Sequence, residues 1–134
     1  MLTLIHQLTP AQIEQLHQMY LKEWWSQERA LADVPILLNN TDLLFGLWDD
    51  EAQQLAAFAR VLTDWVYRAI LFDVIVATDY RGRGLGATLV EHITTHPRLA
   101  QVECIQLFCT PEMRPFYQKY GFGQAEQLLM VRPR

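Results

Sequence analysis

The sequence predicts a mixed α/β fold with a mainly antiparallel sheet flanked by about four helices. Three strand-like segments follow one another across short turns, which is typical of an antiparallel meander. Farther along the chain, a helical pattern separates two apolar, strand-like runs, and a helical crossover of this kind joins parallel strands. The length of 134 residues and the hydrophobic content of 51% suit one domain that spans residues 1–134.

The N-terminal part is expected to form one strand and two helices. Weak alternation of apolar and polar residues predicts a strand at residues 2–8. The capping box Thr9-Pro10-Ala11-Gln12, with proline at the first helical position, begins a helix whose apolar residues recur at helical spacing as far as Trp24. A shorter helix is expected at residues 33–38.

Three strands are expected to follow these helices. The segments at residues 42–48, 54–62 and 67–76 have the composition of strands. Asp49-Asp50-Glu51 connects the first two segments, and Thr63-Asp64-Trp65 connects the second to the third. Connections this short indicate that neighbouring strands run antiparallel.

The second half is expected to hold two helices and two strands. Helical spacing predicts a helix at residues 84–96, which Pro97 ends. An apolar run predicts a strand at residues 102–109. A helix at residues 111–120 starts at a proline and stops at a glycine, and residues 127–131 are expected to return as a final strand.

The cysteines and the histidine pair give no support to a metal site. Cys104 and Cys109 lie five residues apart in the predicted strand, an odd spacing that places them on opposite faces. We therefore expect two reduced, buried thiols and no bond between them. His92 and His96 lie four residues apart on a predicted helix, but no third ligand is evident nearby, so we expect a solvated helix face and no metal.

The most informative motif is Arg81-Gly82-Arg83-Gly84-Leu85-Gly86. An apolar run, Ile70 to Val76, leads into it, and a helical pattern follows it. Glycines let the backbone turn sharply and approach a ligand, and the free N–H groups that open a helix favour an anion. Two arginines add positive charge, so the motif fits a diphosphate. The alternative is a tight connection that binds nothing.

A second motif, Phe116-Tyr117-Gln118-Lys119-Tyr120-Gly121-Phe122, follows the next predicted strand. With both motifs in this order, the chain resembles the GNAT superfamily of acetyl-CoA-dependent N-acetyltransferases. Arg81, Gly84 and Gly86 match the glycine signature of that family, and the second motif matches its aromatic signature. Thr110 departs from the asparagine that many relatives carry six residues before the aromatic pair.

The resemblance implies a fold in which two neighbouring strands, here residues 67–76 and 102–109, splay apart and admit the pantetheine arm of acetyl-CoA. It implies main-chain contacts to that arm from Val74, Ile75 and Val76. It also implies that Tyr117 contacts this co-substrate. The remaining residues expected to bind acetyl-CoA come from the glycine motif and the helix start: Arg81, Gly82, Arg83, Gly84, Leu85, Gly86 and Ala87.

Acetyl transfer to an amine requires a neutral amine, stabilisation of an oxyanion and a proton for the departing thiolate. The resemblance gives the proton donation to Tyr117, for which a core aromatic role is the alternative. A backbone N–H near Val76 is expected to meet the oxyanion. The base is open, because Asp73 inside an apolar strand suits a structural role as well as a catalytic one, whereas Asp64 is better explained as a turn-forming carboxylate.

The net charge of −4 and the lack of a basic cluster argue against nucleic acid or a membrane as a partner. We therefore expect a small-molecule amine or a peptide amine as the acceptor, and a homodimer is left open. Neither a signal peptide nor a membrane span is evident, so we expect a cytoplasmic protein. Most of the aromatic residues of the first half are expected in the core, and some beside an acceptor pocket: Trp24, Trp25, Phe45, Trp48, Trp65 and Tyr67.

Two other functions deserve comparison with acetyl transfer. A GNAT-like module that binds acyl-CoA without catalysis would share both motifs. A dinucleotide-binding oxidoreductase is suggested by the spacing of Gly82, Gly84 and Ala87, with Glu103 farther on. The context argues against the oxidoreductase, because the glycine motif follows a meander rather than a first strand and too little chain remains for the second half of that fold.

Overall fold

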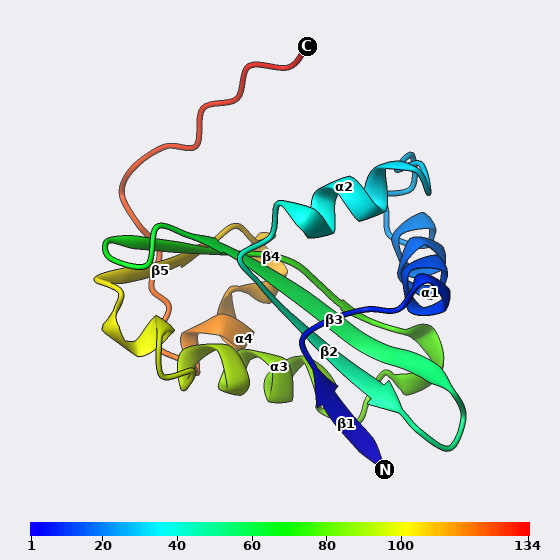
Figure 1. Cartoon of the computed structure of the whole chain (residues 1–134). Coiled ribbons are helices and arrows are strands. Elements are labelled where there is room, and N and C mark those ends of the chain that lie inside the picture. Colours follow the sequence, from blue (N-terminus) through cyan, green and yellow to red (C-terminus); the bar gives the residue numbers. More distant parts are fainter.

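The computed structural model describes residues 1–134 and contains a sheet of five strands in the order β1-β2-β3-β4-β5 (Figure 1). In chain order the strands and α-helices are β1 (Leu2–Ile5), α1 (Pro10–Leu21), α2 (Asp33–Asn39), β2 (Leu43–Asp49), β3 (Gln54–Thr63), β4 (Arg68–Val76), α3 (Leu85–Thr94), β5 (Cys104–Leu107) and α4 (Arg114–Gln118). Short 3-10 helices lie at Thr78–Tyr80, Leu99–Gln101 and Pro111–Met113.

Strand directions follow the expected pattern. β1 to β4 pair antiparallel in sequence order, whereas β4 and β5 pair in parallel across the helical crossover. The mixed, mainly antiparallel α/β sheet is therefore confirmed. None of the helices is both long and apolar enough to cross a lipid bilayer.

Helices cover both faces of the sheet (Figure 1). On one face, Leu89 and Ile93 of α3 belong to a buried cluster with Phe45 of β2 and Tyr117 of α4. On the other face, residues of α1 and α2 form a second cluster with side chains of β2, β3 and β4: Leu16, Met19, Tyr20, Val34, Leu44, Leu55, Phe58 and Ile75. The sheet is thus a layer between two apolar cores, and burial on both faces fixes its register.

The strands β4 and β5 separate along their length. Their parallel pairing runs from Arg68 with Cys104 to Leu71 with Leu107, and β4 continues to Val76 beyond the end of β5. The expected splay is therefore present, and the last part of β4 has no strand neighbour on the β5 side.

A bulge interrupts β4 in this separated part. The register with β3 shifts between Phe58 and Arg60, so that two residues of β4, Asp73 and Val74, lie opposite Ala59. Asp73 takes a positive φ of 56°, which is uncommon for a residue other than glycine. Such a bulge bends the strand and redirects its side chains.

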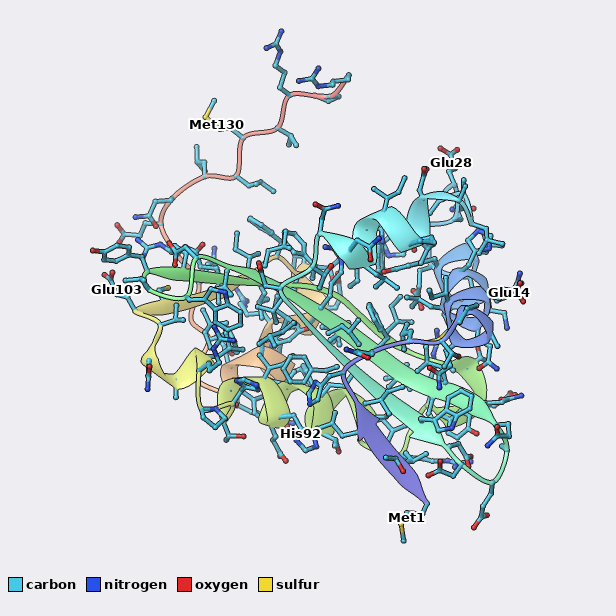
Figure 2. The ribbon with its side chains drawn as sticks, in the orientation of Figure 1. Met1, Glu14, Glu28, His92, Glu103 and Met130 are labelled. Atoms are coloured by element: carbon cyan, nitrogen blue, oxygen red, sulfur yellow. The ribbon has the colours of Figure 1, made fainter.

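The predicted final strand at residues 127–131 is wrong. No strand forms there, and four of its apolar residues are exposed: Leu128, Leu129, Met130 and Val131. The segment extends away from the body of the molecule, as Met130 shows in Figure 2. A strand is stable only where a neighbour accepts its backbone hydrogen bonds, and this segment lies beside none.

Several other boundaries and burial expectations are corrected by the structure. α1 ends at Leu21, so Trp24 and Trp25 lie in the following turns and are 73% and 37% exposed rather than in the core. β5 ends at Leu107, which leaves Cys109 beyond the strand and exposed, while Cys104 is half-buried. The expectation of two buried thiols is therefore wrong.

The other four aromatic residues expected in the core or beside an acceptor pocket differ in their burial. Of Phe45, Trp48, Trp65 and Tyr67, only Phe45 is buried, whereas Trp48 and Trp65 are half-buried and Tyr67 is 61% exposed. Trp65 and Tyr67 lie in or just after the β3–β4 turn, where the sheet offers no deep interior. Most of these residues are therefore not core residues.

Candidate active site

The glycine motif forms the connection from β4 to α3. Gly82 and Gly84 have φ values of 80° and 72°, and nothing lies within 4 Å of where a Cβ would stand on either. Glycine is required here for its backbone conformation, and the open space leaves the backbone accessible. This accessible turn is what a bound phosphate group needs.

The start of α3 presents unpaired donors beside this turn. Gly84 is the residue before the helix, and no side chain caps it. The first intrahelical bond runs from the Thr88 N–H to the Gly84 carbonyl. The N–H groups of the three residues between them, Leu85, Gly86 and Ala87, are therefore free at the positive end of the helix dipole.

The aromatic motif lies against this helix start. The Phe116 ring lies 3.7 Å from the position of a Cβ on Gly86, and a methyl group of Val76 lies 4.0 Å from it. Phe116 meets the Tyr117 ring edge-on, with 4.9 Å between the centroids. The structure thus brings both sequence motifs and the end of β4 together at one place.

Tyr117 is buried and retains its proton. It is 8% exposed, and burial raises the pKa of its hydroxyl to about 12. None of the side-chain hydrogen bonds of the structure involves this hydroxyl, and since no buried polar side-chain atom lacks a partner, its oxygen is accessible to solvent. The hydroxyl is therefore protonated near neutral pH and free to donate.

The register of β4 determines which backbone groups face the separated side. The Ala77 N–H donates to the Ala56 carbonyl at 2.8 Å, so the neighbouring pair of Val76 and Ala57 is one that does not exchange hydrogen bonds. The N–H and C=O of Val76 consequently point away from β3, toward the side where β5 is absent. The same alternation turns the backbone of Ile75 toward β3, so its backbone does not face the gap.

Arg81 links Glu23 to the end of β4. Its Nη2 lies 3.0 Å from Glu23 Oε1, and its Nε donates to the Val76 carbonyl at 3.3 Å. Eight residues around this pair line a small cavity of about 30 Å³: Met19, Lys22, Glu23, Ile75, Val76, Ala77, Thr78 and Arg81.

The carboxylate of Asp73 accepts hydrogen bonds from three side chains. Arg60 Nε and Arg29 Nη1 lie 2.6 Å and 2.9 Å from its Oδ2, and the Tyr20 hydroxyl donates to the same oxygen at 2.9 Å. Burial by itself would raise the pKa of Asp73, but the hydrogen bonds and charges of both arginines outweigh it and hold that pKa below its ordinary value. This arrangement favours the structural role over that of a base.

Asp64 has the turn-forming role that its position in the sequence favoured. Its Oδ1 accepts hydrogen bonds from the N–H groups of Val66, Tyr67 and Arg68 at 2.7–3.0 Å. These backbone hydrogen bonds lower its pKa. A carboxylate held in this way fixes the β3–β4 connection.

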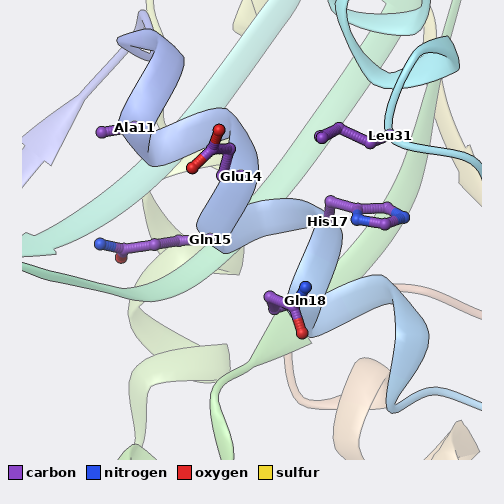
Figure 3. A pocket seen from close by; sticks show the side chains of 6 residues that line it. All are labelled: Ala11, Glu14, Gln15, His17, Gln18 and Leu31. Atoms are coloured by element: carbon purple, nitrogen blue, oxygen red, sulfur yellow. The ribbon is translucent and has the colours of Figure 1, made fainter.

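A wider surface depression of about 410 Å³ lies elsewhere, along α1 (Figure 3). Its walls carry mostly polar side chains: Ala11, Glu14, Gln15, His17, Gln18 and Leu31. None of these residues belongs to either sequence motif, and one ring nitrogen of His17 is already engaged with the Arg29 carbonyl. No three His, Cys, Asp or Glu side chains are grouped as a metal site. Because the depression along α1 contains neither motif, the end of β4 is the candidate active site.

A known protein family matches most of this chain. The sequence matches the profile of the Acetyltransferase (GNAT) family over residues 10–122, which include both motifs and the whole sheet except β1. The chain belongs to the GNAT acetyltransferase family. This family uses acetyl-CoA and acetylates amine substrates.

Relatives of known sequence support the same assignment. The chain is 33% identical over 97 residues to the uncharacterized N-acetyltransferase ycf52 of Pyropia yezoensis, a match that covers 71% of this chain and 56% of that protein. It is 30% identical over 94 residues to GCN5-related N-acetyltransferase 1, chloroplastic, of Arabidopsis thaliana, covering 70% and 48%. The chain thus spans about half the length of the curated relatives it matches.

Solved structures share the fold. A GNAT-family protein from Xanthomonas campestris pv. campestris superposes with a TM-score of 0.82 at 28% identity, over 98% of this chain and 94% of that chain. An acetyltransferase from Trypanosoma brucei superposes with a TM-score of 0.80 at 17% identity, over 99% and 100%. The second likeness concerns the fold alone.

The sequence analysis missed four residues around the candidate site. Tyr20, Arg29 and Arg60 surround Asp73, and Glu23 meets Arg81. The unusual position of Asp73 in an apolar strand did indicate that a partner exists. No local pattern could identify the partners, because they lie 13 to 58 residues away along the chain.

Proposed function

We propose that this chain transfers the acetyl group of acetyl-CoA to an amine of a small molecule or peptide by direct attack of the amine. The observation that carries the proposal is the meeting of three features at the end of β4: the open glycine turn, the outward-facing backbone of Val76 and the Phe116–Tyr117 pair, whose tyrosine keeps its proton. The turn would bind the co-substrate, the Val76 N–H would stabilise the oxyanion and Tyr117 would donate the proton.

The open turn suits the phosphates of acetyl-CoA. Free N–H groups of Leu85, Gly86 and Ala87 would bind them at the start of α3, and Gly82 and Gly84 would let the backbone approach closely. Arg81 and Arg83 lie on the same turn and supply positive charge. A polyphosphate would bind these residues without displacing a side chain, because none caps the start of α3.

The unpaired side of β4 suits the pantetheine arm. Val76 offers an N–H on that side and a C=O that already accepts from Arg81 Nε, and Val74 lies in the adjoining bulge. The backbone of Ile75 faces β3 instead, so we assign Ile75 a packing contribution through its buried side chain. An amide-containing chain inserted here would add hydrogen bonds where the sheet has none.

When bound, acetyl-CoA supplies the thioester carbonyl that the amine attacks. The Val76 N–H would donate to the oxygen of that carbonyl as negative charge develops on it. The Tyr117 hydroxyl would give its proton to the departing sulfur. No covalent bond to the protein is needed, because the amine itself is the nucleophile.

The acceptor is proposed to be a small-molecule amine or a peptide amine, and neither nucleic acid nor a membrane surface. The net charge of −4 supports this choice. A cytoplasmic location, a homodimer and a single domain over residues 1–134 stay predictions.

The test is an assay of CoA thiol release over a panel of small amines and short peptides, with acetyl-CoA as donor. Release that depends on the amine supports the proposal. Binding of acetyl-CoA without release over the whole panel would favour the alternative of a catalytically silent acyl-CoA-binding module.

A further inference from the structure

A second carboxylate lies at the site, and the two sequence motifs do not include it. Glu23 follows the end of α1 and is held there by a hydrogen bond from its own N–H to the Tyr20 carbonyl. Its side chain is 21% exposed. Among the residues that line the small cavity at the end of β4, Glu23 is the only acidic one.

One cationic side chain, Arg81, already contacts Glu23 in this cavity. The Arg81 guanidinium contacts the Glu23 carboxylate at 3.0 Å and the Val76 carbonyl at 3.3 Å. One guanidinium therefore bridges the two oxygens, through Nη2 to Glu23 and through Nε to Val76. The same residue, Val76, carries the N–H that faces the separated side of β4.

The surroundings of Glu23 favour a cation as its partner. The last carbonyl groups of α1, which point toward its C-terminus, add partial negative charge near the cavity. The other charged side chains lining it are Lys22 and Arg81, and both are basic. A ligand ammonium would therefore have to replace Arg81, the one ion-pair partner of Glu23.

Asp73 cannot take this role without losing its own partners. Three donors already occupy its Oδ2, and Arg29 Nη2 approaches its Oδ1 at 3.4 Å. Its side chain is 5% exposed, so a proton has no direct route from it to water. Glu23, by contrast, has one ion-pair partner and an exposed edge.

We propose that Glu23 binds the ammonium group of the acceptor in place of Arg81 and removes a proton from it. This inference rests on the proposed acetyl transfer. The acceptor ammonium loses two protons in the reaction: one before its nitrogen attacks the thioester carbon, and one as the C–N bond forms and the C–S bond breaks. One of these protons replaces the proton that Tyr117 gives to the sulfur, which leaves as a thiol. The other passes from Glu23 to solvent.

The geometry also defines the class of acceptor. With Arg81 in place the cavity measures about 30 Å³, and departure of that side chain would add room for an ammonium group on a slender alkyl chain. The rest of the acceptor would lie outside the cavity, beyond Lys22 on its wall. A cationic alkylamine, such as a polyamine or a lysine-like side chain, meets these conditions.

The experiment compares Glu23→Gln with Glu28→Gln, which removes an exposed acid five residues farther along the same connection (Figure 2). Two ligands are used in binding measurements: a CoA thioether whose S-alkyl chain ends in a primary amine, and the same thioether ending in a methyl group. Wild type and Glu28→Gln should bind the amine-ended ligand about tenfold more tightly, and Glu23→Gln should lose this preference while binding acetyl-CoA as before.

Turnover gives the second measurement. With an active amine, Glu23→Gln should lower kcat/KM by ~10²–10⁴-fold, as removal of a general base does. Equal binding of both thioethers by the wild type would overturn the role of Glu23 even if acetyl transfer is established. Retention of kcat/KM by Glu23→Gln would overturn it as well. Absence of thiol release with every amine, together with a Glu23-dependent preference for the amine-ended thioether, would overturn the proposed function and retain the binding role.

Discussion

Arg60 of β3 and Asp73 of β4 form an ion pair at 2.6 Å across the bulge that ends the regular pairing of these strands. The pair is largely buried, with side-chain exposures of 12% and 5%. Arg29 joins it from the connection between α1 and α2, and its guanidinium also lies over the Tyr20 ring at 4.5 Å. The cluster therefore ties the segment that carries Glu23 to the strand that carries Val76.

We expect Asp73→Ala to destabilise the protein strongly. Removing one partner of a buried ion pair costs about 3–5 kcal/mol, and the value here should lie toward the lower limit because Arg29 is partly exposed. Urea unfolding at pH 7 measures the change. Asp33→Asn, an exposed carboxylate at the start of α2, should change the free energy of unfolding far less, and a similar loss in both variants would contradict the assignment.

The same ion pair predicts a dependence of stability on pH. The folded-state pKa of Asp73 lies below its ordinary value of about 3.9, so the contribution of Asp73 is complete above that value and is lost as the pH falls through the folded-state pKa. Wild type should therefore lose stability in acid more steeply than Asp73→Asn. Parallel curves of unfolding free energy between pH 7 and pH 3 would show that Asp73 makes no such contribution.

Tyr117→Phe tests the proton donor with little disturbance of packing. We expect turnover to fall by ~10²–10⁴-fold, while acetyl-CoA affinity and thermal stability stay near wild type. Since the pKa of Tyr117 is about 12, its ionisation should not limit the wild-type rate below pH 9. The control is Tyr120→Phe, a half-buried tyrosine in the same motif whose ring lies 5.5 Å from Phe116. Full turnover by Tyr117→Phe, when chemistry limits the rate, would return the residue to core packing.

Gly84→Trp should prevent acetyl-CoA binding. The left-handed backbone of Gly84 resists any side chain, and a large one would fill the open space in front of the α3 N-terminus. In a thermal-shift experiment at 100 times the dissociation constant, wild type should gain about 2.7 kcal/mol. Gly123→Ala, at a glycine without positive φ, should keep the shift. A folded Gly84→Trp protein with the wild-type shift would refute the phosphate site.

Asp64→Asn should leave turnover unchanged. An asparagine oxygen still accepts the hydrogen bonds of the Val66, Tyr67 and Arg68 N–H groups, so the β3–β4 turn persists. Asp64→Ala removes the acceptor and should lower the melting temperature without a change in kcat. Loss of kcat in the folded Asn variant would reveal a catalytic role that the geometry does not indicate.

The sequence by itself determined the elements whose signals are local. The capping box at Thr9, the short turns that enforce an antiparallel meander, and the glycines whose positive φ opens α3 all act within a few residues. Both motifs of the candidate site are of this kind, and the structure brings them together at Gly86 and Phe116.

Only the tertiary structure decided which charges meet and which segments find a partner. Asp73 is a structural ion-pair residue because Arg29, Arg60 and Tyr20 reach it from three separate elements. Glu23 lies at the site because α1 ends beside the last residues of β4. The apolar residues 128–131 read as a strand, yet they form none. A strand, like an ion pair, is completed by groups distant in the chain, and no local pattern specifies whether those groups are present.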